Sequence, residues 1–345
     1  MNVVIGWDIG GAHLKGARAE NARIVDAVQL ASPLRLGLTA LADAFAAAKS
    51  RLGRPDRHVI TMTGELADTF ACRADGVEQI TSLAVRALAP TPLSVYAGRV
   101  GFVSPDAVAV HVNDIASANW LASALLVAKA CGTALFMDIG STTTDIVPVR
   151  VGAVVARGYT DAHRLAVGEL VYTGLVRSFL MAVATRAPFA GQWRSLVNEN
   201  FATMADVHRI LGSLPEDADQ MATADGRAKT IVASRARLAR MIGSDATDAE
   251  PERWAALARW FAEAQIRTIL DGAMLVLSCA AMPDSAPVVG AGIGAALARE
   301  VARRLGRDHV AFATLLEVTP SARERACDCA PAAALAVLAA SMPNR

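Results

Sequence analysis

The chain has 345 residues, 53% of them hydrophobic, and can therefore fill the cores of two domains. Its 34 lysines and arginines nearly balance 33 aspartates and glutamates, so charge favours neither nucleic acid nor an anionic membrane as a partner. We therefore expect a small-molecule ligand.

Neither the cysteines nor the N-terminus points outside the cell. The five cysteines form an odd set without zinc-finger spacing, and we interpret Cys327 and Cys329 as reduced thiols near a helix start. The first residues reach Asp8 with no basic segment before it, so we expect no signal peptide and a cytoplasmic location. The apolar stretch 332–342 is shorter than the ~20 residues that cross a bilayer, and we predict no membrane span.

One pattern occurs twice along the chain: an apolar strand, an Asp-Ile-Gly turn and two further strands. The first copy covers residues 2–28, with its turn at Asp8, and the second covers 133–157, with its turn at Asp138. We interpret this as an internal duplication.

Helices and short strands are expected around these copies. Between them, apolar periodicity predicts helices at 38–52 and 114–130 and strands at 59–62 and 93–96. After the second copy it predicts, in order, helices at 165–184, 204–211, 228–241 and 251–279, a strand at 286–289, a helix at 295–305, a strand at 310–314 and a helix at 331–340.

This order predicts two α/β lobes with a ligand cleft between them. We expect an N-terminal lobe at 1–130 and a C-terminal lobe at 131–345, the latter containing a mainly helical insertion at about 165–279.

The two Asp-Ile-Gly turns suit a metal-bound phosphate. A carboxylate at a strand end, as at Asp8 and Asp138, can hold hydrated Mg²⁺. The small residues Gly10, Gly11 and Gly140 let backbone N–H groups approach phosphate oxygens. Ordinary hairpin turns are the alternative, but two copies in matching contexts favour the phosphate interpretation.

The residues after each turn extend the predicted site. Ser141, Thr142 and Thr143 add hydroxyl donors and Asp145 adds a carboxylate, although a Thr-rich strand with one exposed face would account for some of them. Lys15 follows the first turn at a distance from which its ammonium reaches phosphate, with an exposed lysine as the alternative. We expect His13 to satisfy a local hydrogen bond rather than to catalyse.

A third glycine-rich turn follows the strand at 286–289. Gly290, Gly292 and Gly294 precede a helix start, which predicts a ligand-binding turn, with a packing turn as the alternative. The spacing argues against a dinucleotide fold, because the third glycine comes one residue early and only about 50 residues follow.

With these three motifs, 8–11, 138–145 and 288–294, the chain resembles the superfamily of actin, sugar kinases and Hsp70 over essentially its whole length. The resemblance implies the two-lobed actin-like, or ribonuclease H-like, α/β fold. In that superfamily the two turns bind phosphate and the late glycine turn binds adenosine.

Five further stretches resemble one subfamily: 6–15, 61–66, 116–120, 168–174 and 223–227. It comprises the hydantoinase/oxoprolinase-like proteins of tetrahydromethanopterin-linked one-carbon metabolism, which include methanofuran-biosynthesis synthases. The resemblance implies a transferase that condenses an (aminomethylfuranyl)methyl diphosphate with the phenol oxygen of a glutamyl-tyramine or tyrosine-type acceptor and releases pyrophosphate.

If the resemblance holds, a Mg²⁺-bound diphosphate takes the place of ATP. A Thr usually follows the first Gly-Gly in the kinases and hydantoinases, whereas Ala12 stands here, which argues against ATP as the substrate. Glu65 and Asp145 are the candidate bases for the phenol proton. Three arginines of the helical region are candidates for binding an acidic substrate tail, with exposed surface arginines as the alternative: Arg164, Arg177 and Arg227.

Two other functions fit the turns alone. One is an ATP-dependent kinase or hydrolase of the actin-like or hydantoinase class. The other is a nucleotide-binding regulatory protein without turnover.

Overall fold

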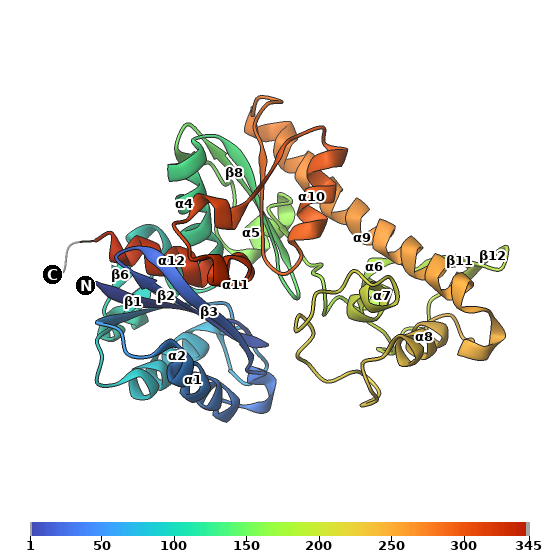
Figure 1. Cartoon of the computed structure of the whole chain (residues 1–345), viewed down its shortest axis with the longest axis horizontal. Coiled ribbons are helices and arrows are strands. Elements are labelled where there is room, and N and C mark those ends of the chain that lie inside the picture. Colours follow the sequence, from blue (N-terminus) through green and yellow to red (C-terminus); the bar gives the residue numbers. More distant parts are fainter. Residues whose placement is uncertain (1, 343–345) are drawn as a thin grey trace.

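The computed structural model describes residues 2–342 and contains two α/β lobes with a mainly helical extension (Figure 1). Residue 1 and residues 343–345, at the outer ends of the two expected lobes, lie outside the described residues. Within residues 2–342, none of the helices combines the length and the apolar character needed to cross a membrane.

The first lobe is built on a sheet of order β3-β2-β1-β4-β5-β6. Its strands are β1 (Val3–Ile9), β2 (His13–Glu20), β3 (Arg23–Ala31), β4 (Arg57–Met62), β5 (Leu93–Tyr96) and β6 (Phe102–Val103). Strand β1 is buried along its whole length because helices cover both faces of the sheet.

Helices α1 (Thr39–Leu52) and α2 (Arg73–Leu88) pack on one face of this sheet. Trp7 of β1 meets Phe45 of α1 there, with ring centroids 5.2 Å apart in an edge-to-face arrangement. The other face carries α12 (Ala330–Ala340), whose alanines pack against β1 and β2. A side chain at Gly6 would collide with the α12 backbone at Ala332, so glycine is required for this close approach.

The second lobe repeats the arrangement of the first. Its sheet has the order β10-β8-β7-β13-β14, with β9 paired to β8. The strands are β7 (Ala134–Ile139), β8 (Thr144–Arg150), β9 (Ala153–Val154), β10 (Leu170–Val171), β13 (Val288–Ala291) and β14 (His309–Ala311). As β1 pairs antiparallel with β2 and parallel with β4, so β7 pairs antiparallel with β8 and parallel with β13, which confirms the predicted duplication.

Helices surround this second sheet and connect it to the rest of the molecule. Helices α4 (Asn119–Cys131), α5 (Asp161–Ala166) and α10 (Ala295–Arg304) pack on its strands, whereas α3 (Val112–Ile115) contacts α2 and α11 (Arg323–Asp328) contacts β3 of the first lobe. Helix α4 contacts both the second sheet and α12, so it joins the two lobes through one shared core.

The extension has a core of its own and is joined to the second lobe by the long helix α9 (Pro251–Ala280), as Figure 1 shows. It also contains α6 (Leu180–Val183), the hairpin β11 (Arg186–Phe189) and β12 (Gln192–Ser195), α7 (Met204–Ile210) and α8 (Ile231–Arg240). A buried ion pair between Arg237 and Asp206, 2.7 Å apart, holds α8 on α7.

Most predicted helices are confirmed, but one is wrong and one is interrupted. The helix expected at 165–184 is replaced by the end of α5, strand β10 and the short α6, because Gly168 has φ +76° and the residues after it bond to the turn at Gly140. The helix expected at 114–130 is two helices, broken at Ser117, whose φ is +53°. The strand expected at 310–314 ends at Ala311, where a 3-10 turn begins.

Helix α2 and the hairpin β11–β12 were not predicted. Polar and glycine positions interrupt the apolar pattern of α2, and the hairpin lies in a segment otherwise dominated by helical periodicity.

Candidate active site

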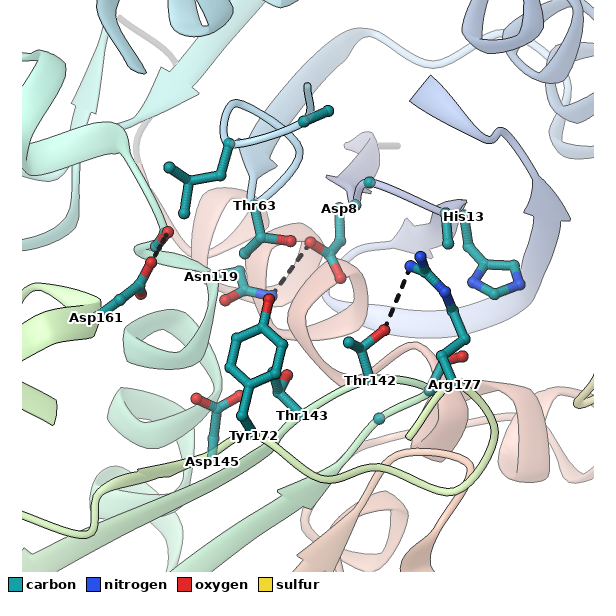
Figure 2. Close-up of a pocket in the computed structure, with 18 of the residues that line it drawn as sticks. Asp8, His13, Thr63, Asn119, Thr142, Thr143, Asp145, Asp161, Tyr172 and Arg177 are labelled. Carbon is teal, nitrogen blue, oxygen red and sulfur yellow. Dashed lines mark hydrogen bonds between the residues drawn. The ribbon is translucent and has the colours of Figure 1, made fainter. Parts of the chain in front are cut away.

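A cavity of about 410 Å³ opens between the two Asp-Ile-Gly turns. The first hairpin contributes Asp8, Gly10, Gly11, Ala12, His13 and Lys15 to its wall, and the second contributes Asp138, Gly140, Ser141, Thr142, Thr143 and Asp145. The structure therefore brings together most of the site residues expected from sequence, drawn from both lobes (Figure 2).

The two turns have the same backbone hydrogen bond. Gly10 N donates to the carbonyl oxygen of His13 at 2.9 Å, and Gly140 N donates to that of Thr143, also at 2.9 Å. The identical closure shows that the fold presents the same turn twice to one cavity.

The side chains next to the turns differ in charge. Across the strand pair, Asp8 lies opposite Lys15 in the first hairpin, whereas Asp138 lies opposite Asp145 in the second. The first hairpin thus supplies an acid and a base, and the second supplies two acids.

A neighbouring segment holds the second turn in place. Leu175 N donates to the carbonyl oxygen of Gly140 at 2.9 Å, and Arg177 N donates to that of Ser141 at 2.8 Å. A side chain at Gly174 would come within 2.6 Å of the Ser141 backbone, so glycine is needed here. Because these bonds occupy carbonyl oxygens, they leave the N–H groups of the loop available to a ligand.

The two turn aspartates are deeply buried. Asp8 and Asp138 are only 5% and 6% exposed. Burial raises the pKa of Asp8, against the lowering effects of Lys15 and of a hydrogen bond from Asn119, and it raises the pKa of Asp138 to about 7. Burial alone would lower the pKa of Lys15, but Asp8 and Asp138 outweigh it and raise that pKa. One lysine thus faces an excess of buried acids.

This charge balance fits a hydrated metal ion. Within residues 2–342, no three His, Cys, Asp or Glu side chains form a ready-made metal site. Mg²⁺ does not need one, because it keeps several waters and is usually bound by one or two carboxylates together with substrate phosphates. Asp8 and Asp138 match that pattern of ligands.

Asp145 has a dedicated partner. Arg164 donates to its carboxylate at 2.7 Å, and the guanidinium lies 4.1 Å from the centre of the Trp120 ring. Burial raises the pKa of Asp145, and Arg164 opposes that shift. Arg164 is almost fully buried in these contacts. It therefore pairs with Asp145 and is not free to bind an acidic substrate tail.

Arg177 lines the cavity without a carboxylate partner in the described part of the chain. Its Nη1 lies 3.5 Å from Thr142 Oγ1, and Figure 2 shows it beside His13. Arg35, which also lines the cavity, likewise forms no ion pair among the described residues. Burial lowers the pKa of Arg177 and Arg35 lowers it further. Arg227 lies outside the cavity wall, on an exposed loop.

His13 is neutral in this environment. Burial, Lys15 and Arg177 together lower its pKa to about 3. The second ring nitrogen, Nε2, is buried and has no hydrogen-bond partner in the part of the chain that is described.

Glu65 lies behind the cavity wall rather than in it. It is 1% exposed, and Ser117, which lines the cavity, donates to it at 2.9 Å. Burial raises the pKa of Glu65 to about 7.

The third glycine turn does not line the cavity. Gly292 has φ +79°, and a side chain there would collide with the carboxylate of Asp138. Gly294 N donates to the carbonyl oxygen of Ile139 at 2.8 Å. Gly292 and Gly294 therefore pack against the end of β7, whereas a side chain at Gly290 would meet His309 of β14, and the ligand contact expected of this turn stays a prediction.

Several cavity residues were not expected from the turn motifs. Asn119 donates to Asp8 at 3.3 Å, and Thr63, Asp161 and Tyr172 also line the wall. Asn119 and Tyr172 fall within the stretches 116–120 and 168–174, so the family resemblance was the signal that could have identified them.

A loop of the extension reaches the same cavity. Met221 lies on the wall, and Gln220 donates to the carbonyl oxygen of Gln29 in the first lobe at 3.2 Å. Asp225 anchors this loop to the buried Arg237, with 3.1 Å between their charged atoms. The stretch 223–227 thus positions a loop that bridges both sides of the cavity.

Comparison with known proteins gives three informative matches. The hydantoinase/oxoprolinase family matches residues 56–322. The (4-{4-[2-(gamma-L-glutamylamino)ethyl]phenoxymethyl}furan-2-yl)methanamine synthase of Methanocaldococcus jannaschii is 31% identical over 246 residues, which cover 70% of this chain and 72% of that protein. A protein of the same name from Methanococcus vannielii is 32% identical over 111 residues, or 32% of this chain and 50% of that protein.

Among solved structures, the nucleotide-free structure of acetone carboxylase superposes with a TM-score of 0.59. The match covers 96% of this chain and 70% of that chain at 11% sequence identity. At this identity the likeness concerns the fold alone.

Proposed function

The chain belongs to the hydantoinase/oxoprolinase family and has the actin-like fold, and from this we propose that it is a synthase of furan-cofactor biosynthesis. In the proposed reaction it condenses an (aminomethylfuranyl)methyl diphosphate with the phenol oxygen of a glutamyl-tyramine or tyrosine-type acceptor and releases pyrophosphate. The compound after which the two similar synthases are named contains the corresponding phenoxymethyl-furan ether.

The observation that carries the proposal is the pair of buried carboxylates at two facing turns. Asp8 and Asp138 approach one cavity from different lobes, together with Lys15 of the first hairpin and the hydroxyl-bearing loop at Ser141 of the second. Such an arrangement suits a compact, highly charged ligand such as a diphosphate.

The main contribution that the proposed reaction requires of the protein is stabilisation of charge. The phenol oxygen forms a bond to the furanylmethyl carbon, while the bond from that carbon to the diphosphate oxygen breaks and its electron pair leaves with pyrophosphate. The furan ring stabilises positive charge on the adjacent carbon, so the barrier depends mainly on neutralising the leaving diphosphate. Mg²⁺, when bound, would supply Lewis-acid neutralisation of that charge.

The residues of this chain have separate tasks in that scheme. Lys15 supplies a fixed positive charge, and the loop N–H groups and hydroxyls at Ser141 and Thr142 donate to phosphate oxygens. Arg177 and Arg35, which lack acidic partners among the described residues, form a positive region suited to an anionic group of either substrate.

Two features favour a diphosphate over ATP. Ala12 replaces the hydroxyl residue expected beside a nucleotide phosphate. The glycine turn at Gly292, which would be the adenosine motif, packs behind Asp138 instead of facing the cavity.

Product analysis tests the proposal. Purified protein and Mg²⁺ are incubated with ATP alone and then with a furanylmethyl diphosphate and tyramine- or tyrosine-type phenols, and phosphate, pyrophosphate and ether are measured. We expect ether and pyrophosphate in equal amounts without ATP. ATP turnover without ether would instead support a kinase or hydrolase, and tight ATP binding without any product would support a regulatory protein.

A further inference from the structure

The Ser117 hydroxyl lies between two carboxylates at the edge of the cavity. Its Oγ is 2.9 Å from Glu65 Oε1 and 3.1 Å from Asp161 Oδ2. A serine hydroxyl carries a single proton and can donate it to only one of them at a time. The two acids therefore compete for this proton.

The surroundings of the two carboxylates stabilise their ionised forms to different extents. Asp161 forms an ion pair with Arg73, with 2.9 Å between the charged atoms, and 19% of its side chain is exposed. Glu65 is nearly inaccessible, and its Oε2 is buried without a hydrogen-bond partner among the described residues. Because an ion pair stabilises a carboxylate and burial destabilises it, Glu65 is the acid that gains more by accepting a proton.

Ser117 is the link between Glu65 and the cavity. Ser117 and Asp161 line the wall, whereas Glu65 lies behind it. The backbone of Ser117 adopts φ +53°, a left-handed conformation that costs free energy in a residue other than glycine. This conformation separates α3 from α4. Ser117 lies in the short connection between the two helices, at the cavity wall.

We propose that Glu65 accepts the proton of the phenolic substrate through the Ser117 hydroxyl. This inference rests on the proposed function and assigns the step that makes the phenol nucleophilic. The phenol proton passes to Ser117 Oγ as the proton of Ser117 passes to Glu65 Oε1. The phenol oxygen then bonds to the furanylmethyl carbon, and the diphosphate leaves with the electron pair of the broken bond.

Asp145, the other candidate base, is less suited to this task. Arg164 donates to its carboxylate at 2.7 Å, and the same guanidinium is almost fully buried against Trp120. A carboxylate held by a buried cation is a weaker proton acceptor than one without such a partner.

The charged groups around Glu65 determine the expected pH dependence. Burial, with a smaller contribution from Asp161, raises the pKa of Glu65 to about 7 against the lowering effects of its hydrogen bonds, among them the one from Ser117, and of the charge of Arg73. Because the ionised form is the acceptor, kcat/KM should increase with pH up to about 7 and then level off. The pKa of Asp138 is also about 7, so the profile is measured at saturating Mg²⁺, which keeps that carboxylate ionised.

The test compares Glu65→Gln and Ser117→Gly with the wild type. Glycine tolerates the positive φ at 117, so this variant removes the hydroxyl without adding strain. Ser123→Ala is the matched control, because Ser123 is a fully buried serine of α4 whose hydroxyl has no partner within residues 2–342. Thermal denaturation of each variant checks that it folds.

We expect both relay variants to lose about 100-fold in kcat and to lose the rise of kcat/KM with pH, with little change in the KM for the diphosphate. A nitrophenol-type acceptor that is already ionised at neutral pH should restore most of the lost rate, because it needs no base. A merely structural role for Glu65 would reduce the rate equally with both phenols.

The possible failures are distinguishable. If the wild type forms no ether with either phenol, both the proposed function and the proton transfer from Ser117 to Glu65 are wrong. If the wild type forms ether and the relay variants keep a normal kcat and pH profile, or the acidic phenol gives no rescue, only the relay is wrong.

Discussion

The hairpins β1–β2 and β7–β8 share one backbone but carry different side chains. At matched positions after each turn, the first has Gly11, Ala12 and His13, and the second has Ser141, Thr142 and Thr143. The duplicated fold therefore supplies the buried carboxylate twice, while the remaining chemistry is divided between the copies.

The division concerns charge as well as hydrogen bonding. The first hairpin offers few donors but supplies Lys15, the cation nearest the acids. The second supplies hydroxyls and an extra acid, Asp145, which Arg164 neutralises from outside the hairpin. Because the two halves of the site differ, they can bind a ligand in one defined orientation. Two identical halves would bind it equally well in either orientation.

The halves also differ in what supports them. Helix α12 packs behind the first hairpin, whereas the second is held by the segment 174–177. Gln265 of α9 donates to the carbonyl oxygen of Gly174 at 2.8 Å, and His208 of α7 bonds to the same glutamine at 3.0 Å. These bonds connect the core of the extension to the second turn, while its loop at Gln220 reaches the first lobe.

The largest expected effect concerns what the two hairpins have in common. Asp8→Asn and Asp138→Asn should each lower kcat by about 100-fold or more, because each removes one of the two charges that, in the proposed function, organise the metal and the phosphates. Steady-state kinetics of pyrophosphate release gives the measurement, with Asp43→Asn on the exposed face of α1 as the control. A loss of kcat in only one of the two variants would show that the two turns do not act as a pair.

The next effect tests the cation of the first hairpin. Lys15→Met should raise the KM for the diphosphate about 10- to 100-fold, as expected for the loss of a charged hydrogen bond worth about 1.5–3 kcal/mol. Lys129→Met, at an exposed position near the end of α4, controls for loss of one positive charge. An unchanged KM would place the phosphates away from the first hairpin.

A smaller effect is expected from the hydroxyls of the second hairpin. Ser141→Ala and Thr142→Ala should each raise the KM for the diphosphate about two- to tenfold, the range for a neutral hydrogen bond of about 0.5–1.5 kcal/mol. Thr268→Ala, on the exposed side of α9, is the control. Equal KM values in all three variants would mean that the backbone of this loop, and not its hydroxyls, binds the ligand.

The smallest effect is on stability. Asp138→Asn, which should lower activity, should at the same time raise the stability of the fold. The folded protein raises the pKa of Asp138 from an ordinary value of 3.8 to about 7, so its ionised form disfavours the folded state above pH 7. Asp138→Asn should therefore raise the Tm of the metal-free protein by a few degrees at pH 8, and the gain should shrink as the pH falls towards 4. Calorimetry that shows a lower Tm at pH 8 would mean that Lys15 fully compensates the buried charge.

Sequence patterns were sufficient for features that local chain order determines. The duplicated turns at Asp8 and Asp138 could be predicted because each lies within one continuous strand-turn-strand segment. The long helix α9 was predictable for the same reason.

Features set by distant contacts could not be predicted. The segment 174–177 bonds to the turn at Gly140 and not to its own preceding residues, so apolar periodicity suggested a helix that does not form. Gly292 follows the pattern of an anion-binding turn, yet only the packing of β13 against β7 reveals that it lies behind Asp138. The link from Glu65 to the cavity likewise depends on Ser117, at a helix break that no local pattern indicates.

In the proposed function the paired turns assist departure of a diphosphate rather than transfer of a phosphoryl group. Mass spectrometry after incubation with an acceptor whose phenol oxygen is ¹⁸O tests this directly. We predict that the label remains in the ether and that the released pyrophosphate is unlabelled, because the carbon–oxygen bond of the diphosphate breaks. Label in a phosphorylated phenol would show cleavage at phosphorus and contradict the account.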